Sequence, residues 1–326
     1  MNISRSNQWA SCISTKASRV WSGGAVPNSC ACCYHARSSF PDPTCHVLAY
    51  RHQFHAGCFS DVFKHALLAQ LVLALGKKDK PFFYLDTHAG IAHYDLAHEW
   101  AQKNAEYRDG IELIWARQDA PPEMAPYLDA VRAENANGKL RYYPGSPCIV
   151  RRLVRARDRM VLTELNRKDC EALAARYFRD RRVTVEFSDG YQALKAHLPP
   201  PERRGLIFVD SSFDRAREFA RLTQGLAGAY RKFATGVYAL WYPLMEPMAM
   251  RALERGIIAT GIRRILQLEI SVHPGELTPS LRGCGLLVVN PPFGFEVTAR
   301  TILEWLAPVL TRTGEGGQRV SWLAGQ

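Results

Sequence analysis

The sequence PFFYLDTHAG, residues 81–90, joins a short apolar run to a small polar loop that ends in glycine. Residues 82–86 are aromatic or aliphatic up to the final aspartate, and the run has the length of a strand rather than of a helix. Such a run, bounded by a proline and a polar loop, predicts a strand buried in a sheet.

On either side of this strand the pattern is helical. Upstream, Ser60 and Asp61 offer an N-cap for an amphipathic helix that extends to about Leu75. Downstream, residues 94–143 are polar, rich in alanine and helical in period, without strand signals. They predict a small helical insertion.

Further apolar runs follow, and helical stretches separate the first four: residues 160–164, 183–187, 206–210 and 237–242. Strands that alternate with helices predict an α/β fold whose mostly parallel sheet is covered on both faces. Two later runs, 265–272 and 285–290, lie closer together and predict an antiparallel hairpin at one edge of the sheet.

Carboxylates stand at the ends of several predicted strands: Asp86, Glu164, Asp189 and Asp210. In open α/β sheets, ligands bind at the carboxyl ends of the strands. A single carboxylate there is more often a loop cap than a ligand contact. Four of them at one edge favour a binding site for the hydroxyls or amines of a ligand.

Sequence motifs exclude several familiar sites. The chain has no G-x-x-x-x-G-K-[ST] phosphate loop, and residues 86–92 lack the G-x-G-x-x-G spacing of a dinucleotide-binding loop. It also has no nucleophile elbow and no H-E-x-x-H zinc motif.

The chain is basic. Its 326 residues are 47% hydrophobic and 22% charged, which is an ordinary globular composition. The formal charge of +11 favours a polyanionic partner, nucleic acid first and an anionic membrane surface second, although an enzyme without such a partner can carry the same surplus. Ten arginines predict a phosphate-binding face, with solvated helix faces as the alternative: Arg151, Arg152, Arg155, Arg157, Arg159, Arg179, Arg181, Arg182, Arg203 and Arg204.

The first 46 residues differ from the rest of the chain. They hold five of the nine cysteines (Cys12, Cys30, Cys32, Cys33 and Cys45) and show no helical or strand period. Three hypotheses account for them: a zinc knot, a basic Ser-rich transit peptide, or a segment outside the folded protein with the true start at Val47. The third is preferred, because the composition changes just before the ordered pattern begins at Leu48.

No run of apolar residues approaches the roughly 20 that span a bilayer, and no secretory signal is recognisable. A cytoplasmic location is therefore expected.

Several strings, in this order along the chain, together resemble one family. They are YRHQFHAG at 50–57 with DVFKH at 61–65, YLDTHAG at 84–90, LRYYPGSP at 140–147, TEL at 163–165, DG at 189–190 and YALWYP at 238–243. Residues 47–326 resemble the RlmJ family of 23S rRNA adenine N6-methyltransferases.

The resemblance implies a class I, Rossmann-like methyltransferase fold with a small helical insertion. It also implies S-adenosylmethionine (SAM) as the cofactor, no metal, and methylation of the exocyclic amine of one adenine in 23S rRNA. Asp210 would be the catalytic residue, Tyr50 would contact the RNA, and Phe213 would stack on the extruded base. The implied SAM-binding residues are His65, His88, Ser146, Glu164, Asp189, Gly190 and Asp210.

These roles suit the residue types, and each has a simpler alternative. The Glu164 carboxylate can accept both ribose hydroxyls of SAM, or it can be a plain strand end. Asp189 can accept the adenine amine of the cofactor, although an Asp-Gly pair by itself is more often an ordinary turn. His65 and His88 are candidates for the cofactor site or for core histidines with internal partners.

The catalytic motif departs from the family pattern. Adenine N6-methyltransferases usually carry [DN]-P-P-[YF], whereas this chain has DSSF at 210–213. Without both prolines the loop is less restrained, so a weakened enzyme that still binds SAM and RNA is the second hypothesis. A DNA adenine methyltransferase is the third. Ala92 replaces an expected glycine, and Cys58, Phe59 and Ser60 replace expected polar residues.

Residues 290–293 are NPPF and spell the catalytic motif in full. They follow the last predicted strand of the sheet. We expect them to form a structural turn rather than the catalytic site.

Overall fold

The computed structural model describes residues 51–213, 217–272, 281–311 and 316–325. Tyr50, Val47 and the five N-terminal cysteines lie outside these ranges. The predictions made for them therefore stay predictions.

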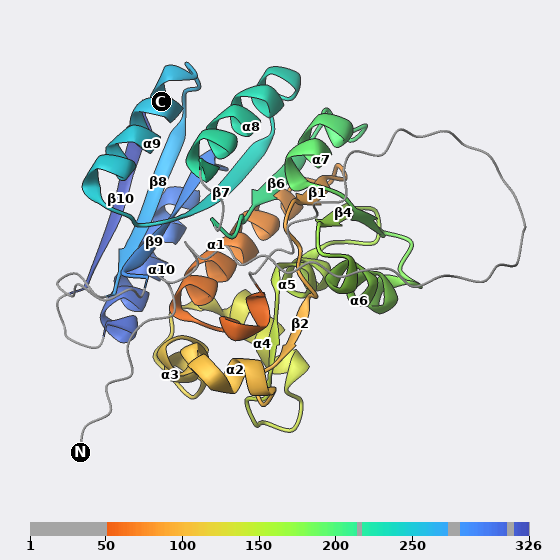
Figure 1. Cartoon of the computed structure of the whole chain (residues 1–326), viewed down its shortest axis with the longest axis vertical. Helices are drawn as coiled ribbons and strands as arrows, with labels where there is room; N and C mark the ends of the chain where they lie inside the picture. Colours follow the sequence, from red (N-terminus) through yellow and green to blue (C-terminus); the bar gives the residue numbers. More distant parts are fainter. Residues whose placement is uncertain (1–50, 214–216, 273–280, 312–315, 326) are drawn as a thin grey trace, which may run out of the picture. The chain divides into compact units, whose positions relative to one another are not determined.

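A sheet of eight strands organises the described residues (Figure 1). In chain order the strands are β1 (Phe83–Asp86), β4 (Arg159–Glu164), β5 (Val183–Phe187), β6 (Gly205–Val209), β7 (Val237–Pro243), β8 (Ile265–Ser271), β9 (Gly283–Val289) and β10 (Gly317–Ala324). They lie in the order β10-β8-β9-β7-β6-β1-β4-β5. The five strands from β7 to β5 are parallel, whereas β9 is antiparallel to both β7 and β8, and β10 is antiparallel to β8.

The predicted mostly parallel sheet is confirmed, but the predicted edge hairpin is wrong. β8 and β9 do pair, yet β9 lies between β7 and β8 and so is an interior strand. The edge belongs to β10, which the sequence did not predict. Its side chains are exposed or only half-buried, so it lacks the apolar alternation that marks a strand.

Helices cover both faces of the sheet, as the alternation along β1 shows. Tyr84 packs in the core that includes α1 (Phe59–Gly76), α4 (Ala125–Glu134), α5 (Ser146–Leu153), α6 (Arg167–Tyr177) and α10 (Phe295–Leu310). Phe83 and Leu85 pack in the core on the other face, under α7 (Gly190–His197), α8 (Glu218–Lys232) and α9 (Pro247–Ala259). Figure 1 shows α7, α8 and α9 side by side.

The segment between β1 and α5 contains several short helices, and two short strands flank them. The elements are β2 (His93–Asp95), α2 (Glu99–Asn104), α3 (Ile111–Trp115), α4 and β3 (Tyr142–Pro144), with 3-10 turns at Glu106–Asp109 and Pro122–Met124. β2 and β3 pair as an antiparallel ribbon, which contradicts the prediction that residues 94–143 contain no strand. Three residues are too few for a strand period to appear in the sequence.

The helix α1 lies in the core and is not amphipathic as predicted. Fourteen of its 18 residues are buried, because it packs against α4, α5, α10 and the sheet. Its N-cap is Cys58, so Ser60 and Asp61 lie inside the first turn. By length and composition α1 could cross a membrane, contrary to the expectation from the sequence, but a buried core helix meets the same criterion and the finding is weak evidence.

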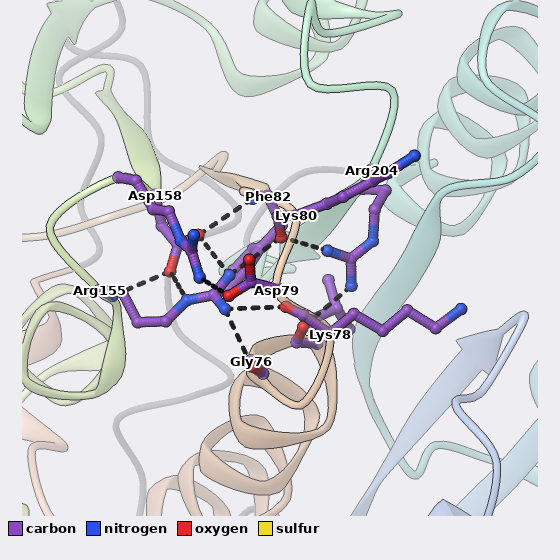
Figure 2. Close-up of polar contacts among 10 residues, drawn as sticks. Gly76, Lys78, Asp79, Lys80, Phe82, Arg155, Asp158 and Arg204 are labelled. Atoms are coloured by element: carbon purple, nitrogen blue, oxygen red, sulfur yellow. Dashed lines mark hydrogen bonds and ion pairs between the residues drawn. The ribbon is translucent and has the colours of Figure 1, made fainter.

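Arginines at the amino ends of the parallel strands hold the loop that follows α1 (Figure 2). Arg155 donates hydrogen bonds of 2.8–3.0 Å to the main-chain carbonyls of Gly76, Lys78 and Lys80. Arg204 donates to two carbonyls of the same segment. These two members of the predicted phosphate-binding face are therefore structural, which corrects that prediction in part.

Candidate active site

The predicted carboxylates meet at one edge of the sheet. Asp86 ends β1, Glu164 ends β4, Asp210 follows β6, and Asp189 caps α7 after β5. These four strands are parallel neighbours, with β4 on one side of β1 and β6 on the other. Connections from the two sides of β1 leave in opposite directions, which makes this the position where open α/β sheets bind ligands.

Asp86 differs from its predicted role because its side chain is fully buried. Its Oδ2 accepts hydrogen bonds from Ser146 Oγ and Tyr84 Oη, each at 2.8 Å. Burial raises the pKa of Asp86 to about 6, although these two hydrogen bonds oppose the rise. Asp86 therefore joins β1 to the first turn of α5 and does not face a ligand.

The loop after β1 and the start of α7 are in close contact. A Cβ atom on Gly190 would lie 2.3 Å from the Thr87 carbonyl oxygen and 2.8 Å from Thr87 Cβ, so this position requires glycine. His88 Nδ1 lies 2.8 Å from Thr87 Oγ1, and burial lowers the pKa of His88. The structure therefore places His88 and Gly190 together beside the carboxyl end of β1.

Glu164 is fixed by backbone groups. Its Oε2 accepts from the Gly90 N–H at 2.9 Å and its Oε1 from the Asn166 N–H at 2.7 Å. Burial raises its pKa. Each oxygen keeps a second lone pair, so the carboxylate is held in one orientation with acceptor capacity to spare.

Asp189 is the N-cap of α7, the simpler of its two predicted roles. Its Oδ1 accepts from the Tyr191 and Gln192 N–H groups at 2.9 and 3.3 Å. Its Oδ2 pairs with Arg221 at 3.0 Å. A cap uses only part of the acceptor capacity of a carboxylate, so a ligand contact remains open to it.

Asp210 is joined to α1 through a buried lysine that the sequence analysis did not single out. Lys64 Nζ lies 2.7 Å from Asp210 Oδ2 and 2.8 Å from Asp61 Oδ1. His52 Nε2 and the Gly57 N–H bind the other oxygen of Asp61, at 3.0 and 2.9 Å. Burial raises the pKa of Asp61, but His52 and Lys64 outweigh burial and hold it well below its ordinary value.

A signal for this cluster was present in the sequence. Lys64 and His65 interrupt an otherwise apolar helix, and charged residues are almost never fully buried unless they are paired. His65 itself is buried and its Nδ1 lies 2.8 Å from Tyr143 Oη. Burial lowers its pKa to about 3, so it is neutral. The structure therefore shows His65 as a buried histidine with an internal partner, the simpler of its two predicted roles.

A hydrogen-bond network restrains the loop that carries DSSF. Ser211 is buried, and its Oγ donates to Glu218 Oε1 at 2.6 Å. Tyr191 Oη donates to the same oxygen at 2.7 Å, and Arg221 pairs with both Glu218 and Asp189. The serine at the first proline position is thus tied to the first turn of α8.

Phe213, predicted to stack on the target base, packs against protein in this structure. Its ring lies 4.9 Å from the ring of Phe219 and 5.7 Å from that of Trp241. Its backbone φ is +52°, a left-handed conformation that is strained for an aromatic residue. Stacking on a base stays a prediction for Phe213.

The departures at Ala92 and at residues 58–60 have visible consequences. Ala92 has a φ of +66°, a left-handed conformation that suits the glycine expected at this position. Cys58, Phe59 and Ser60 are buried at the start of α1. Burial raises the pKa of the Cys58 thiol to about 12, so it stays protonated.

Asn290 lies near the amino ends of the parallel strands, whereas Asp210 lies at their carboxyl ends. Because β9 is antiparallel to β7, its last residue, Val289, pairs with Tyr238 at the start of β7. Asn290 Nδ2 donates to the carbonyls of Ala234 and Gly236 at 2.8 Å each. The NPPF sequence therefore forms a turn with structural contacts, in agreement with the expectation.

Within the described ranges, no group of three or more His, Cys, Asp or Glu side chains is arranged to hold a metal ion.

Comparison with known proteins identifies the family. The model of the family described as "Ribosomal RNA large subunit methyltransferase D, RlmJ" matches residues 79–324. The chain belongs to the RlmJ family. Its predicted Rossmann-like class I methyltransferase fold is confirmed by the sheet order and by this membership.

Two curated relatives are each named Ribosomal RNA large subunit methyltransferase J. The protein of Escherichia coli (strain K12) is 43% identical over 277 residues, which are 85% of this chain and 99% of the relative. The protein of Haemophilus influenzae is 39% identical over 278 residues, with the same coverage of 85% and 99%. A crystal structure of a Legionella pneumophila protein is also similar, with a TM-score of 0.76, 35% identity, and coverage of 82% of this chain and 98% of that chain.

Proposed function

We propose that this RlmJ-family protein transfers the methyl group of S-adenosylmethionine to the N6 amine of one adenine in 23S rRNA. The observation that supports an amine as the methyl acceptor is the hydrogen bonding of the Asp210 carboxylate. Its Oδ2 is bound by Lys64 at 2.7 Å, and its Oδ1 accepts no hydrogen bond from any described residue. A carboxylate fixed in this way can accept an N–H of the target amine. We expect the protein to act in the cytoplasm.

The residues at the carboxyl edge of the sheet fit SAM. Glu164 is fixed by two N–H groups and has lone pairs left for the ribose hydroxyls. Gly190 allows the start of α7 to pack closely against Thr87, in the loop after β1, where a Cβ atom would overlap. His65, His88, Ser146, Asp189 and Asp210 complete the proposed cofactor site. When bound, SAM supplies an electrophilic methyl group on a sulfonium centre.

The reaction needs positioning rather than a strong base. In the proposed complex, Asp210 Oδ1 and the Ser211 carbonyl each accept one N–H of the adenine amine, which directs the nitrogen lone pair at the methyl group. As the N–C bond forms and the S–C bond breaks, positive charge develops on the nitrogen. The Asp210 carboxylate, held in place by Lys64, stabilises this charge. The nitrogen then loses a proton to Asp210 or to water.

A weakened enzyme that retains SAM and RNA binding remains the second candidate, because both prolines are replaced. The hydrogen bond from Ser211 to Glu218 favours the active form, since it restrains the same loop by other means. Tyr50 and Phe213 remain the proposed RNA contacts. Modification of DNA is left as an outcome of the test.

The test is methyl transfer from labelled SAM to an unmodified 23S rRNA transcript, followed by nucleoside analysis. We expect N6-methyladenosine with the parent chain and none with Asp210→Ala. SAM binding by calorimetry accompanies both. Bound SAM without turnover would select the weakened-enzyme candidate, and turnover on duplex DNA but not on the transcript would select the DNA methyltransferase.

A further inference from the structure

A basic hollow lies away from the active site, at the C-terminal ends of α5 and α6. Its volume is about 710 Å³, and it is lined by Arg151, Arg176, Tyr177, Arg179, Asp180 and Arg182. We call these residues the arginine hollow. Four guanidinium groups face one carboxylate in this set, so the hollow carries a net positive charge.

The acids near the hollow are too few to satisfy its arginines. Arg151 and Arg182 both pair with Asp180. Arg176 pairs with Glu134 at 2.9 Å, just outside the lining. Arg179 is exposed and forms no ion pair with any residue in the described ranges. Since each guanidinium has five N–H donors, these pairs fix the arginines and leave donors for a further anion.

An exposed aromatic side chain accompanies these charges. Phe178 is 83% exposed and lies between Tyr177 and Arg179 in the chain. Aromatic faces next to arginines are the usual platforms on which proteins stack unpaired bases. A phosphate-binding set with an aromatic neighbour fits a nucleic acid better than a small anion.

The other arginines of the basic sequence have different roles. Arg155 and Arg204 hold the carbonyls of the loop after α1 (Figure 2). Arg159 pairs with Glu202 and lies over the ring of Phe83. The structure therefore divides the ten predicted phosphate-binding arginines, and three of them, Arg151, Arg179 and Arg182, line the hollow together with Arg176.

We propose that the arginine hollow is a second RNA site, which binds backbone phosphates of the substrate away from the target adenine. This inference rests on the proposed function. The planar fork of arginine matches phosphate oxygens in pairs.

The position of α6 makes such a site reachable. This helix begins beside Glu164, at the edge that carries the active site, and ends at the hollow. Its 11 residues span roughly 16 Å at 1.5 Å per residue. A folded RNA of the size that small RNA-binding domains contact, about 16 base pairs, is longer than this. One RNA stem can therefore contact both places.

The test compares the parent chain with two variants. One is a double variant that carries both Arg176→Ala and Arg179→Ala, and the other is the single variant Phe178→Ala. The matched control is Arg251→Ala with Arg255→Ala, two exposed arginines on α9, which covers the other face of the sheet. Filter binding of a 23S rRNA transcript gives Kd at several salt concentrations. Steady-state methylation gives kcat and KM, and calorimetry gives the Kd for SAM. Thermal unfolding checks that each variant folds.

We expect the double variant to raise the Kd and KM for the transcript about tenfold at physiological salt, and to lower the salt slope by roughly 1.5, since each lost phosphate contact removes about 0.7–0.9. Phe178→Ala should raise the Kd about fivefold and leave the slope unchanged, because stacking involves no counterion release. The control pair should bind the transcript with the Kd and salt slope of the parent chain. In every variant, kcat and the affinity for SAM should stay at the parent values.

A double variant that binds the transcript with the Kd and salt slope of the parent would overturn the second RNA site. The binding measurement decides this whether or not the parent methylates the transcript. A parent chain that binds the transcript without methylating it contradicts the proposed function alone, so the two failures are distinguishable.

Discussion

Lys64 Nζ lies 2.7 Å from Asp210 Oδ2, so a buried ammonium on α1 fixes the carboxylate proposed to hold the target amine. The same nitrogen binds Asp61 at 2.8 Å and lies 5.4 Å from the ring of Trp241. The side chain of Lys64 is 4% exposed. The position of Asp210 is therefore set from a different element of the fold, across the core.

The variant Lys64→Met removes this ammonium and leaves two carboxylates without their shared partner. We expect methyl transfer to fall by about 10²–10³, because a fixed hydrogen-bonding group in the site is lost. Removing one partner of a buried ion pair also costs about 3–5 kcal/mol of unfolding free energy. Turnover and urea unfolding measure the two effects. Lys77→Met, an exposed change just beyond the same helix, is the control and should alter neither by much. Full turnover in Lys64→Met would contradict the proposed role of the pair.

The variants Ser211→Ala and Ser211→Pro separate loop restraint from other roles of this serine. Alanine removes the hydrogen bond to Glu218, and we expect kcat to fall about tenfold, equivalent to about 1.4 kcal/mol. Proline restores the restraint of the family motif, so it should keep kcat near that of the parent. The affinity for SAM serves as the internal control. Equal kcat values for alanine and the parent would show that the hydrogen bond does not support catalysis.

The buried carboxyl of Asp86 predicts a pH-dependent stability. Burial raises its pKa from 3.8 to about 6, so the folded protein holds this proton more tightly than the unfolded chain. The resulting contribution to the unfolding free energy is complete below pH 4 and is lost as the pH rises through 6. Two pKa units correspond to about 2–3 kcal/mol.

His65 titrates in the opposite sense, because burial lowers its pKa from 6.5 to about 3, and its contribution is lost as the pH falls. The useful quantity is therefore the difference between Asp86→Asn and the parent. We expect the variant to gain about 2–3 kcal/mol relative to the parent between pH 4 and pH 8. Urea unfolding at several pH values measures this, with the exposed Asp129→Asn as control. A difference that stays constant with pH would show that Asp86 titrates normally.

The variant Asn290→Ala tests the choice between the two motifs. It removes two hydrogen bonds of 2.8 Å and places alanine at a φ of +52°. We expect a loss of about 1–3 kcal/mol in unfolding free energy, with kcat unchanged. Asn290→Gly, which tolerates the left-handed backbone, should lose less stability than alanine. Loss of turnover in a folded Asn290→Ala protein would mean that NPPF, not DSSF, carries the reaction.

The strands that hold the site were predictable, because five-residue apolar runs between helices have few other interpretations. Glu164 and Asp210 were found by their position at the ends of such runs. The edge strand β10 was not predicted, since a half-exposed strand has little apolar alternation. The position of β9 between β7 and β8 was also hidden, because it depends on tertiary pairing rather than on any local pattern.

The residues that hold the carboxylates and the DSSF loop in position were less predictable than the carboxylates themselves. Ser146 was expected to bind SAM, yet its hydroxyl donates to the buried Asp86. Glu218 was not considered at all, because its role depends on side-chain contacts with Ser211 and Tyr191 that no local sequence pattern shows. Lys64 was quoted only as one letter of a motif, although its charge within an apolar helix indicated a buried partner.

Two four-residue sequences in this chain resemble one catalytic signature, and the direction of the preceding strand decides between them. A strand has a direction as well as a composition, and reversing it moves the residues that follow it from the end of the sheet with the proposed cofactor site to the opposite end. The complete signature follows the strand of reversed polarity, β9, while the degenerate one follows β6. For proteins of this architecture, the information in a short signature is therefore incomplete until the topology of its strand is known, and a perfect match can be less informative than an imperfect one.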